Sequence, residues 1–197
     1  GVALHSLTRI DLAEESLQKA YELKSDAAPT LHFLGMVSLA QNSPAEAEKI
    51  MLKAVALDSM SAEIWFHLGQ SQMRQQKWAE ARESLNRAHS LDSKVSEVLY
   101  NLSEVNKRLE ERDAAKIYAV LFKQVADFEE ERDRLEKRLA GNPMETEMRR
   151  QLAELHERYG NLVHAAEYLR QAAYLGDEEA VSELNRLAEK IKRLDSN

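Results

Sequence analysis

The amino-acid sequence predicts an all-α protein: a solenoid of paired helices, interrupted by one long helix and ending in a helical bundle with a capping helix. Glycine and proline are scarce, with 6 and 3 among 197 residues, whereas sandwiches and barrels need many tight turns. Apolar positions recur at a fixed spacing, which is typical of stacked helix pairs. A stretch without glycine or proline, from Arg112 to Ala140, predicts the long helix.

The fixed spacing is 34 residues. The pair Leu34-Gly35 recurs as Leu68-Gly69 and, weakened, as Leu102-Ser103. Three further sets keep the same step: Ala13, Ala47, Ala81 and Ala115; Ala20, Ala54 and Ala88; Leu17, Met51 and Leu85. A repeated unit of this length cannot bury its apolar face alone, so we expect successive units to stack.

The unit 28–61 illustrates the predicted helix pair. One face of its first helix carries Leu31, Leu34 and Val37. The turn before Pro44 ends that helix, and proline is acceptable in the first turn of the next one. The second helix repeats apolar residues at three- and four-residue steps: Ala47, Ile50, Met51, Ala54 and Val55. Small residues such as Gly35 and Ala47 would let the two helices approach closely.

Residues 1–125 are therefore predicted to form a repeat array of units 28–61, 62–95 and 96–125, preceded by an incomplete unit 1–27. Gly1 falls at the glycine position of a first helix whose opening half is absent, so we expect the chain to begin inside a repeat. An irregular N-terminal cap is the alternative.

The repeats resemble the tetratricopeptide repeat (TPR) family. Its pattern of Trp-x₂-Leu-Gly, then Ala-x₃-Phe, then Ala is matched by Trp65, Leu68, Gly69, Ala81, Leu85 and Ala88. The chain departs from the family in two sets of positions: Ser38, Gln72 and Asn106 replace a usual Tyr, and Ser25, Ser59 and Ser93 replace a frequent Pro. The resemblance implies a right-handed helical array whose first helices line a concave surface.

The period breaks after Ser96, because the next unit begins at Thr146, 50 residues on, so 16 residues are inserted. We expect one helix over 112–140, with a heptad stripe that is apolar apart from one charged interruption at Arg132: Ala114, Tyr118, Leu121, Val125, Phe128, Arg132, Leu135 and Leu139. It should carry residues 126–197 outward as a second domain, with a TPR-like unit 146–179 and a capping helix 180–195. The far half of the stripe could pack on Met148, Leu152 and Leu155, or form a homodimer through residues 128–140.

No chemistry-bearing motif stands out. The glycines are isolated and cysteine is absent, which excludes phosphate-cradling loops and thiolate sites. His32 and His67 could meet across neighbouring helices, but no carboxylate shares their face as a third metal ligand. We therefore expect no catalytic residue, cofactor or metal. The net charge of −7 and the lack of a basic cluster argue against nucleic acid, and no apolar stretch could span a membrane.

The sequence thus favours a non-catalytic scaffold that binds an apolar or amphipathic protein segment in the concave groove. The alternative is the TPR arm of a larger enzyme, such as a glycosyltransferase or sulfotransferase. Residues one repeat apart form rows along the predicted groove: His32, Phe66 and Tyr100; Val2, Met36, Gln70 and Glu104; His5, Leu39, Met73 and Lys107. The first two rows lack the Lys, Asn and Arg of family members that grip chaperone tails, so we expect no affinity for such acidic peptides.

Overall fold

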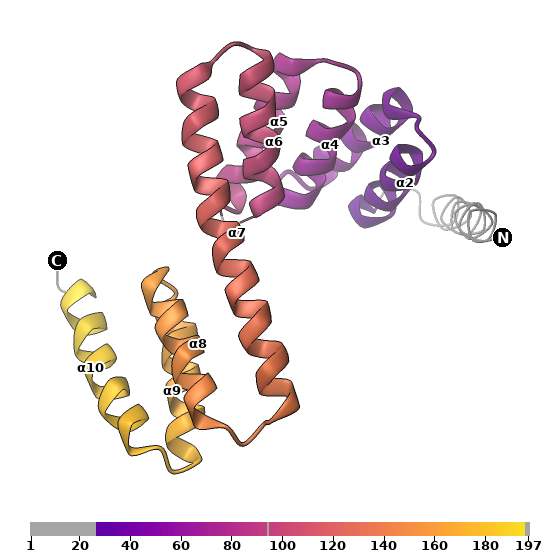
Figure 1. Cartoon of the computed structure of the whole chain (residues 1–197). Coiled ribbons are helices and arrows are strands. Elements are labelled where there is room, and N and C mark those ends of the chain that lie inside the picture. Colours follow the sequence, from indigo (N-terminus) through magenta and orange to yellow (C-terminus); the bar gives the residue numbers. More distant parts are fainter. Residues whose placement is uncertain (1–26, 94, 196–197) are drawn as a thin grey trace. The chain divides into compact units, whose positions relative to one another are not determined.

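The computed structural model describes residues 27–93 and 95–195, all of whose regular structure is helical, which confirms the predicted all-α class (Figure 1). Residues 1–26 of the incomplete first repeat, among them Val2 and His5, lie outside the described residues. The helices follow in this order: α2 (Ala28–Ala40), α3 (Pro44–Leu57), α4 (Ala62–Arg74), α5 (Trp78–Leu91), α6 (Ser96–Arg108), α7 (Arg112–Gly141), α8 (Thr146–Arg158), α9 (Leu162–Tyr174) and α10 (Glu178–Asp195). No described helix has the length and apolarity that crossing a membrane requires.

The long helix predicted over 112–140 is confirmed, because α7 is continuous and ends one residue later, at Gly141. The chain divides into two compact units whose boundary falls inside α7, between Lys123 and Gln124. The domain boundary expected from the sequence lies two residues further along the same helix, and independent behaviour of the two parts stays a prediction. Each unit is described separately below.

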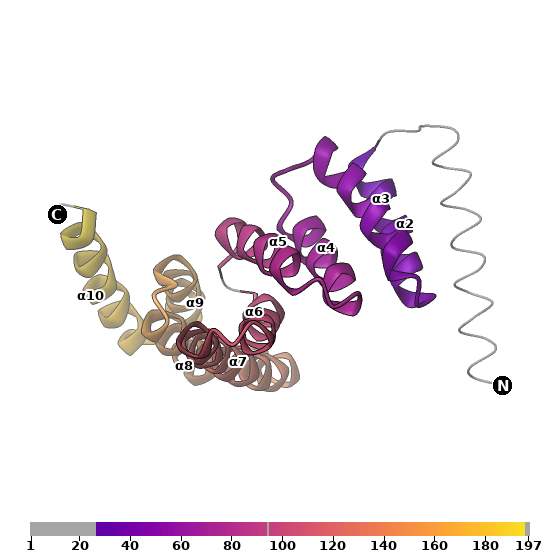
Figure 2. The same cartoon turned by 90° about the horizontal axis from the view of Figure 1, so that it is seen from above.

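In the first unit, helices that are neighbours in sequence lie against one another, as Figures 1 and 2 show for α2 to α5. Equivalent residues of the two complete repeats form its core: Ala47, Met51 and Ala54 of α3, and Ala81, Leu85 and Ala88 of α5, all fully buried. Trp65 of α4 packs against the core of both repeats. The repeated apolar positions thus stack successive units, as the period predicts.

The glycine of each repeat marks the closest approach within a helix pair. A Cβ atom on Gly35 would lie 2.5 Å from Cε of Met51, and one on Gly69 would lie 2.8 Å from Cγ of Leu85. Both distances are shorter than van der Waals contact allows, so a side chain here would push α2 from α3 or α4 from α5. The expectation that small residues permit close packing is confirmed.

The turns between paired helices share one backbone conformation. Asn42, Gln76 and Glu110, each 34 residues apart, have φ of 57°, 60° and 62°. Gly160 has a φ of 76° in the corresponding turn between α8 and α9. Only glycine adopts this left-handed region without steric cost, so the repeat geometry imposes mild strain on Gln76 and Glu110.

In the second unit, the distal half of α7 packs on α8. Leu135, only 3% exposed, joins Leu152 and Leu155 in a core against which Phe128 and Leu139 also pack. The far half of the apolar stripe therefore packs, within its own chain, on two of the three residues expected for it, Leu152 and Leu155. Helix α10 covers α9, with Ala180 and Leu187 fully buried, and begins two residues before the expected capping helix.

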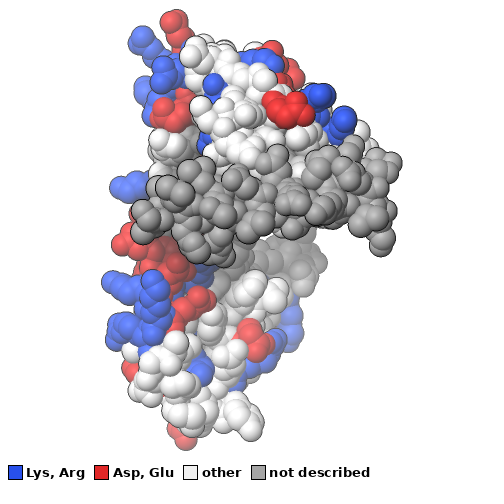
Figure 3. Space-filling model, turned by 90° about the vertical axis from the view of Figure 1, so that its right-hand side faces the viewer, with Lys and Arg blue, Asp and Glu red and all other residues white. Residues whose placement is uncertain are grey.

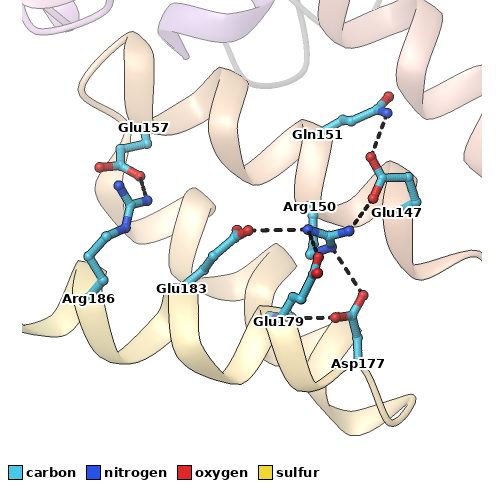
Figure 4. Close-up of polar contacts among 9 residues, drawn as sticks. Glu147, Arg150, Gln151, Glu157, Asp177, Glu179, Glu183 and Arg186 are labelled. Atoms are coloured by element: carbon cyan, nitrogen blue, oxygen red, sulfur yellow. Dashed lines mark hydrogen bonds and ion pairs between the residues drawn. The ribbon is translucent and has the colours of Figure 1, made fainter.

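Charged contacts also hold α10 to the rest of the second unit (Figure 4). The guanidinium of Arg150 on α8 contacts four carboxylates: Glu147, Asp177, Glu179 and Glu183. Glu157 on α8 accepts hydrogen bonds from Arg186 and Lys190 on α10. The polar face of α10 thus pairs with α8.

Candidate functional site

A groove of about 590 Å³ crosses the first helices of the repeats. Its walls come from α2, α4, the start of α6 and the two loops that join successive repeats. Phe33 and Met36 on α2 lie in this groove with 52% and 36% of their surface exposed. Exposed apolar side chains in a concave site are available to a ligand, because filling the groove would remove them from water.

The lining residues come in pairs one repeat apart. Each pair occupies equivalent positions of successive units: His32 and Phe66, Phe33 and His67, Asp58 and Asp92, Glu63 and Glu97, Ile64 and Val98. The stacking that buries the core therefore also aligns these side chains along one surface. Both apolar and acidic pairs occur in this lining, and no Lys or Arg is among the described lining residues.

His32 and His67 meet in the groove wall. Nε2 of His32 lies 2.9 Å from Nδ1 of His67, which in turn lies 2.8 Å from the carbonyl oxygen of Glu63. Because a carbonyl oxygen can only accept, Nδ1 of His67 carries the proton and donates it. Nε2 of His32 then has no proton and accepts, so the single N–H of His67 is shared between this nitrogen and the carbonyl oxygen. The predicted approach of the two histidines is confirmed.

Both imidazoles have a pKa below the ordinary histidine value of about 6.5, which favours their neutral form. Burial lowers the pKa of His32, and the charge of His67 lowers it further, against the opposing effect of Glu63. Burial also lowers the pKa of His67, although the carbonyl and the carboxylate of Glu63 oppose the change. No group of three His, Asp or Glu side chains within the described ranges is arranged to hold a metal ion.

The structure distributes the sequence-predicted groove residues unevenly. His32, Met36 and Phe66 line the groove. The others lie elsewhere: Gln70 and Met73 are half-buried on α4, Tyr100 packs on Phe122, Glu104 pairs with Lys107, and Leu39 is buried. Leu39, at 5% exposure, cannot offer its side chain to a partner. His5 lies outside the described residues.

The rows predicted from the sequence did not include Phe33, His67 or any of the acidic lining residues. The rows followed one face of each first helix, whereas the groove also includes the adjacent face and the loops between repeats. The sequence did contain an indication of these acidic residues, because Asp58 and Asp92 are 34 residues apart, and so are Glu63 and Glu97. Equivalent acidic residues in successive repeats predict a shared surface.

Comparison with known proteins identifies the repeat. Residues 34–94 match the family model described as tetratricopeptide repeat. No curated protein matches the sequence. Among solved structures, MamA superimposes with a TM-score of 0.53 at 22% identity, over 89% of this chain and 94% of its own.

Two further structures share the fold, and their descriptions mention peptide binding. YrrB, described as a TPR protein with an unusual peptide-binding site, has a TM-score of 0.51 at 19% identity, over 91% of this chain and 86% of its own. The second TPR of Spaghetti (RPAP3), bound to the HSP90 peptide SRMEEVD, has a TM-score of 0.50 at 18% identity, over 54% of this chain and 98% of its own. At these identities the similarity extends to the fold alone.

Proposed function

Because residues 34–94 match the tetratricopeptide repeat family, we propose that the chain is a non-catalytic scaffold that holds a segment of a partner protein in the groove of α2, α4 and α6. The observation that carries this proposal is the exposure of Phe33 and Met36 inside a concave site. A monomer rarely leaves neighbouring large apolar side chains exposed in a groove unless they contact something.

The lining suits a protein segment. Methionine and phenylalanine provide apolar contact area, and the flexible Met36 can repack around different side chains. No Lys or Arg is among the described lining residues, and basic and acidic side chains are intermixed over the described part of the face seen in Figure 3, whereas a duplex-binding protein needs a clustered basic surface. The lining therefore favours a protein partner over a nucleic acid.

A peptide-display selection on the full chain tests the proposal. Peptides should be enriched on the unaltered protein and lose affinity for Phe33→Ala and Met36→Ala, two changes that leave the charge of the groove unaltered. Burial of a large apolar side chain contributes about 1.5–3 kcal/mol, so each change should weaken binding about tenfold or more.

Leu52→Ala is the matched control, because Leu52 is 50% exposed on α3 and does not line the groove. It should leave peptide affinity unchanged. If Leu52→Ala abolishes binding while the groove variants bind normally, the site lies on another face. Phe66→Ala is a less clean probe, since Phe66 also packs against the core of the second repeat.

The homodimer through residues 128–140 is not part of this proposal. Leu135 is buried against Leu152 and Leu155, and Phe128 and Leu139 pack on the same core. These contacts use the apolar stripe that a dimer would need. We expect a monomer by molecular-mass measurement in solution.

A further inference from the structure

The charged side chains among the described lining residues of the groove are all acidic. Four carboxylates line it, those of Asp58, Glu63, Asp92 and Glu97, and the described lining residues include no Lys or Arg. The two histidines are neutral and do not offset this charge. A concave site with apolar walls concentrates the negative potential of such groups, because the walls exclude water.

Three of these carboxylates, those of Asp58, Glu63 and Glu97, have no cationic partner among the described residues. Asp58 accepts a hydrogen bond from the backbone N–H of Met60, and Glu97 accepts one from the hydroxyl of Ser96. Within the described residues, no ion pair joins Asp58, Glu63 or Glu97 to a Lys or Arg. Elsewhere in the same repeats a carboxylate is paired, as Glu48 is with Lys77.

The acidic residues are arranged as two rows beside the apolar anchors. Asp58 and Asp92 occupy the loops between repeats, and Glu63 and Glu97 occupy the first turns of α4 and α6. A ligand that contacts Phe33 and Met36 therefore meets carboxylates along the same groove. An acidic ligand would be repelled there, whereas a cation would supply a counter-charge to Asp58, Glu63 and Glu97.

We infer that the groove selects a basic, partly apolar protein segment, in which Lys or Arg side chains flank an apolar anchor. The inference rests on the proposed function and specifies its partner. An exposed phenylalanine ring such as that of Phe33 adds a favourable surface for a guanidinium. An acidic peptide like SRMEEVD, which RPAP3 binds, has the opposite charge and should be rejected.

The composition of the peptides selected on the full chain tests the inference. Peptides that bind the unaltered protein, but not the Phe33→Ala and Met36→Ala variants, should combine net positive charge with aromatic or aliphatic residues. Enrichment of neutral or acidic peptides by the same criterion would overturn the inference and leave the proposed function standing. If no peptide distinguishes the unaltered protein from these variants, the proposed function fails, and the inference fails with it.

Charge substitutions give a quantitative check. The double variant Glu63→Gln, Glu97→Gln should lower the affinity for the selected peptide about 5- to 20-fold in a titration at low salt. An exposed ion pair between one carboxylate and the peptide is weak, but both carboxylates act on the same peptide. The control Glu80→Gln, Glu83→Gln on α5 removes the same charge outside the groove and should change affinity less than twofold. Equal effects of the two double variants would show that net charge alone attracts the peptide and would refute the inference.

Discussion

The ring nitrogens Nε2 of His32 and Nδ1 of His67 lie 2.9 Å apart across α2 and α4. The carbonyl of Glu63 fixes the proton on Nδ1 of His67, so the ring of His32 must accept. Protonation of His32 would place two N–H donors against each other in a partly buried site. The packing of these two successive repeats therefore depends on both rings being neutral.

The first unit should therefore become less stable as the pH falls below about 6.5, the ordinary pKa of histidine. Both folded-state pKa values are lowered, so below pH 6.5 the unfolded chain binds more protons than the folded one. The free energy of unfolding then falls on acidification, by at most about 1.4 kcal/mol per pH unit for each histidine. Urea unfolding at pH 7.5 and 5.5 measures this difference.

The two tryptophans, Trp65 and Trp78, both belong to the first unit, so their fluorescence reports its unfolding alone. The variant His32→Gln, His67→Gln should lose most of the pH dependence. His164→Gln, on the exposed surface of α9, should retain it. Carboxylates with a lowered pKa, such as that of Glu48 beside Lys77, become protonated only at more acidic pH. Their contribution to the free energy of unfolding is therefore retained over this pH range. A normal pH dependence in the double variant would contradict the role of the pair.

Close packing at Gly69 gives a second prediction. Gly69→Ala should destabilise the first unit by about 1–2 kcal/mol, because the new methyl group meets Cγ of the fully buried Leu85. The gain in helix propensity of about 1 kcal/mol offsets only part of this cost. Gly35→Ala should cost less, since the atom it meets is the flexible end of Met51. Tryptophan fluorescence during denaturation compares the two variants.

Gly141→Ala provides the control, because a Cβ atom there would have no neighbour within 4 Å. It should leave thermal unfolding, followed by circular dichroism, unchanged or slightly improved. If Gly69→Ala also proves neutral, α4 and α5 can separate freely and the close approach is not needed for stability.

The repeat frame could be predicted from the sequence because burial itself is periodic. Met51 and Leu85 are 34 residues apart and both fully buried, since each lies between its own helix pair and the next unit. The end of α7 was predictable for a local reason, as Gly141-Asn142-Pro143 cannot continue a helix.

The site was predicted less well, because a row of equivalent residues specifies position in the repeat and not exposure. Leu39, Met73 and Lys107 share one row, yet the first is buried, the second half-buried and the third exposed. Their neighbours differ along the array, and only the assembled structure shows that difference. The contribution of the inter-repeat loops, with Asp58 and Asp92, likewise depends on where the chain turns between helices.

A third prediction concerns the attachment of α10 to the second unit. Arg150 is 23% exposed and contacts Glu147 of its own helix together with Asp177, Glu179 and Glu183 around the start of α10 (Figure 4). Asp177 also accepts a hydrogen bond from the backbone N–H of Ala180, which caps the helix and lowers the pKa of its carboxyl group. A single cation thus holds together carboxylates that would otherwise repel one another.

Arg150→Gln should weaken the docking of α10 by about 1–2 kcal/mol, because it leaves these carboxylates without a counter-charge. Amide hydrogen exchange over residues 178–195 should then speed up about 5- to 30-fold, while exchange in α2 to α5 stays unchanged. Arg170→Gln is the matched control, since Arg170 pairs with Glu167 within α9 and both side chains are exposed; it should leave exchange in α10 unaltered. If Arg150→Gln has no more effect than this control, the apolar contacts of Ala180 and Leu187 are sufficient to hold the helix, and the ionic cluster contributes little to its position.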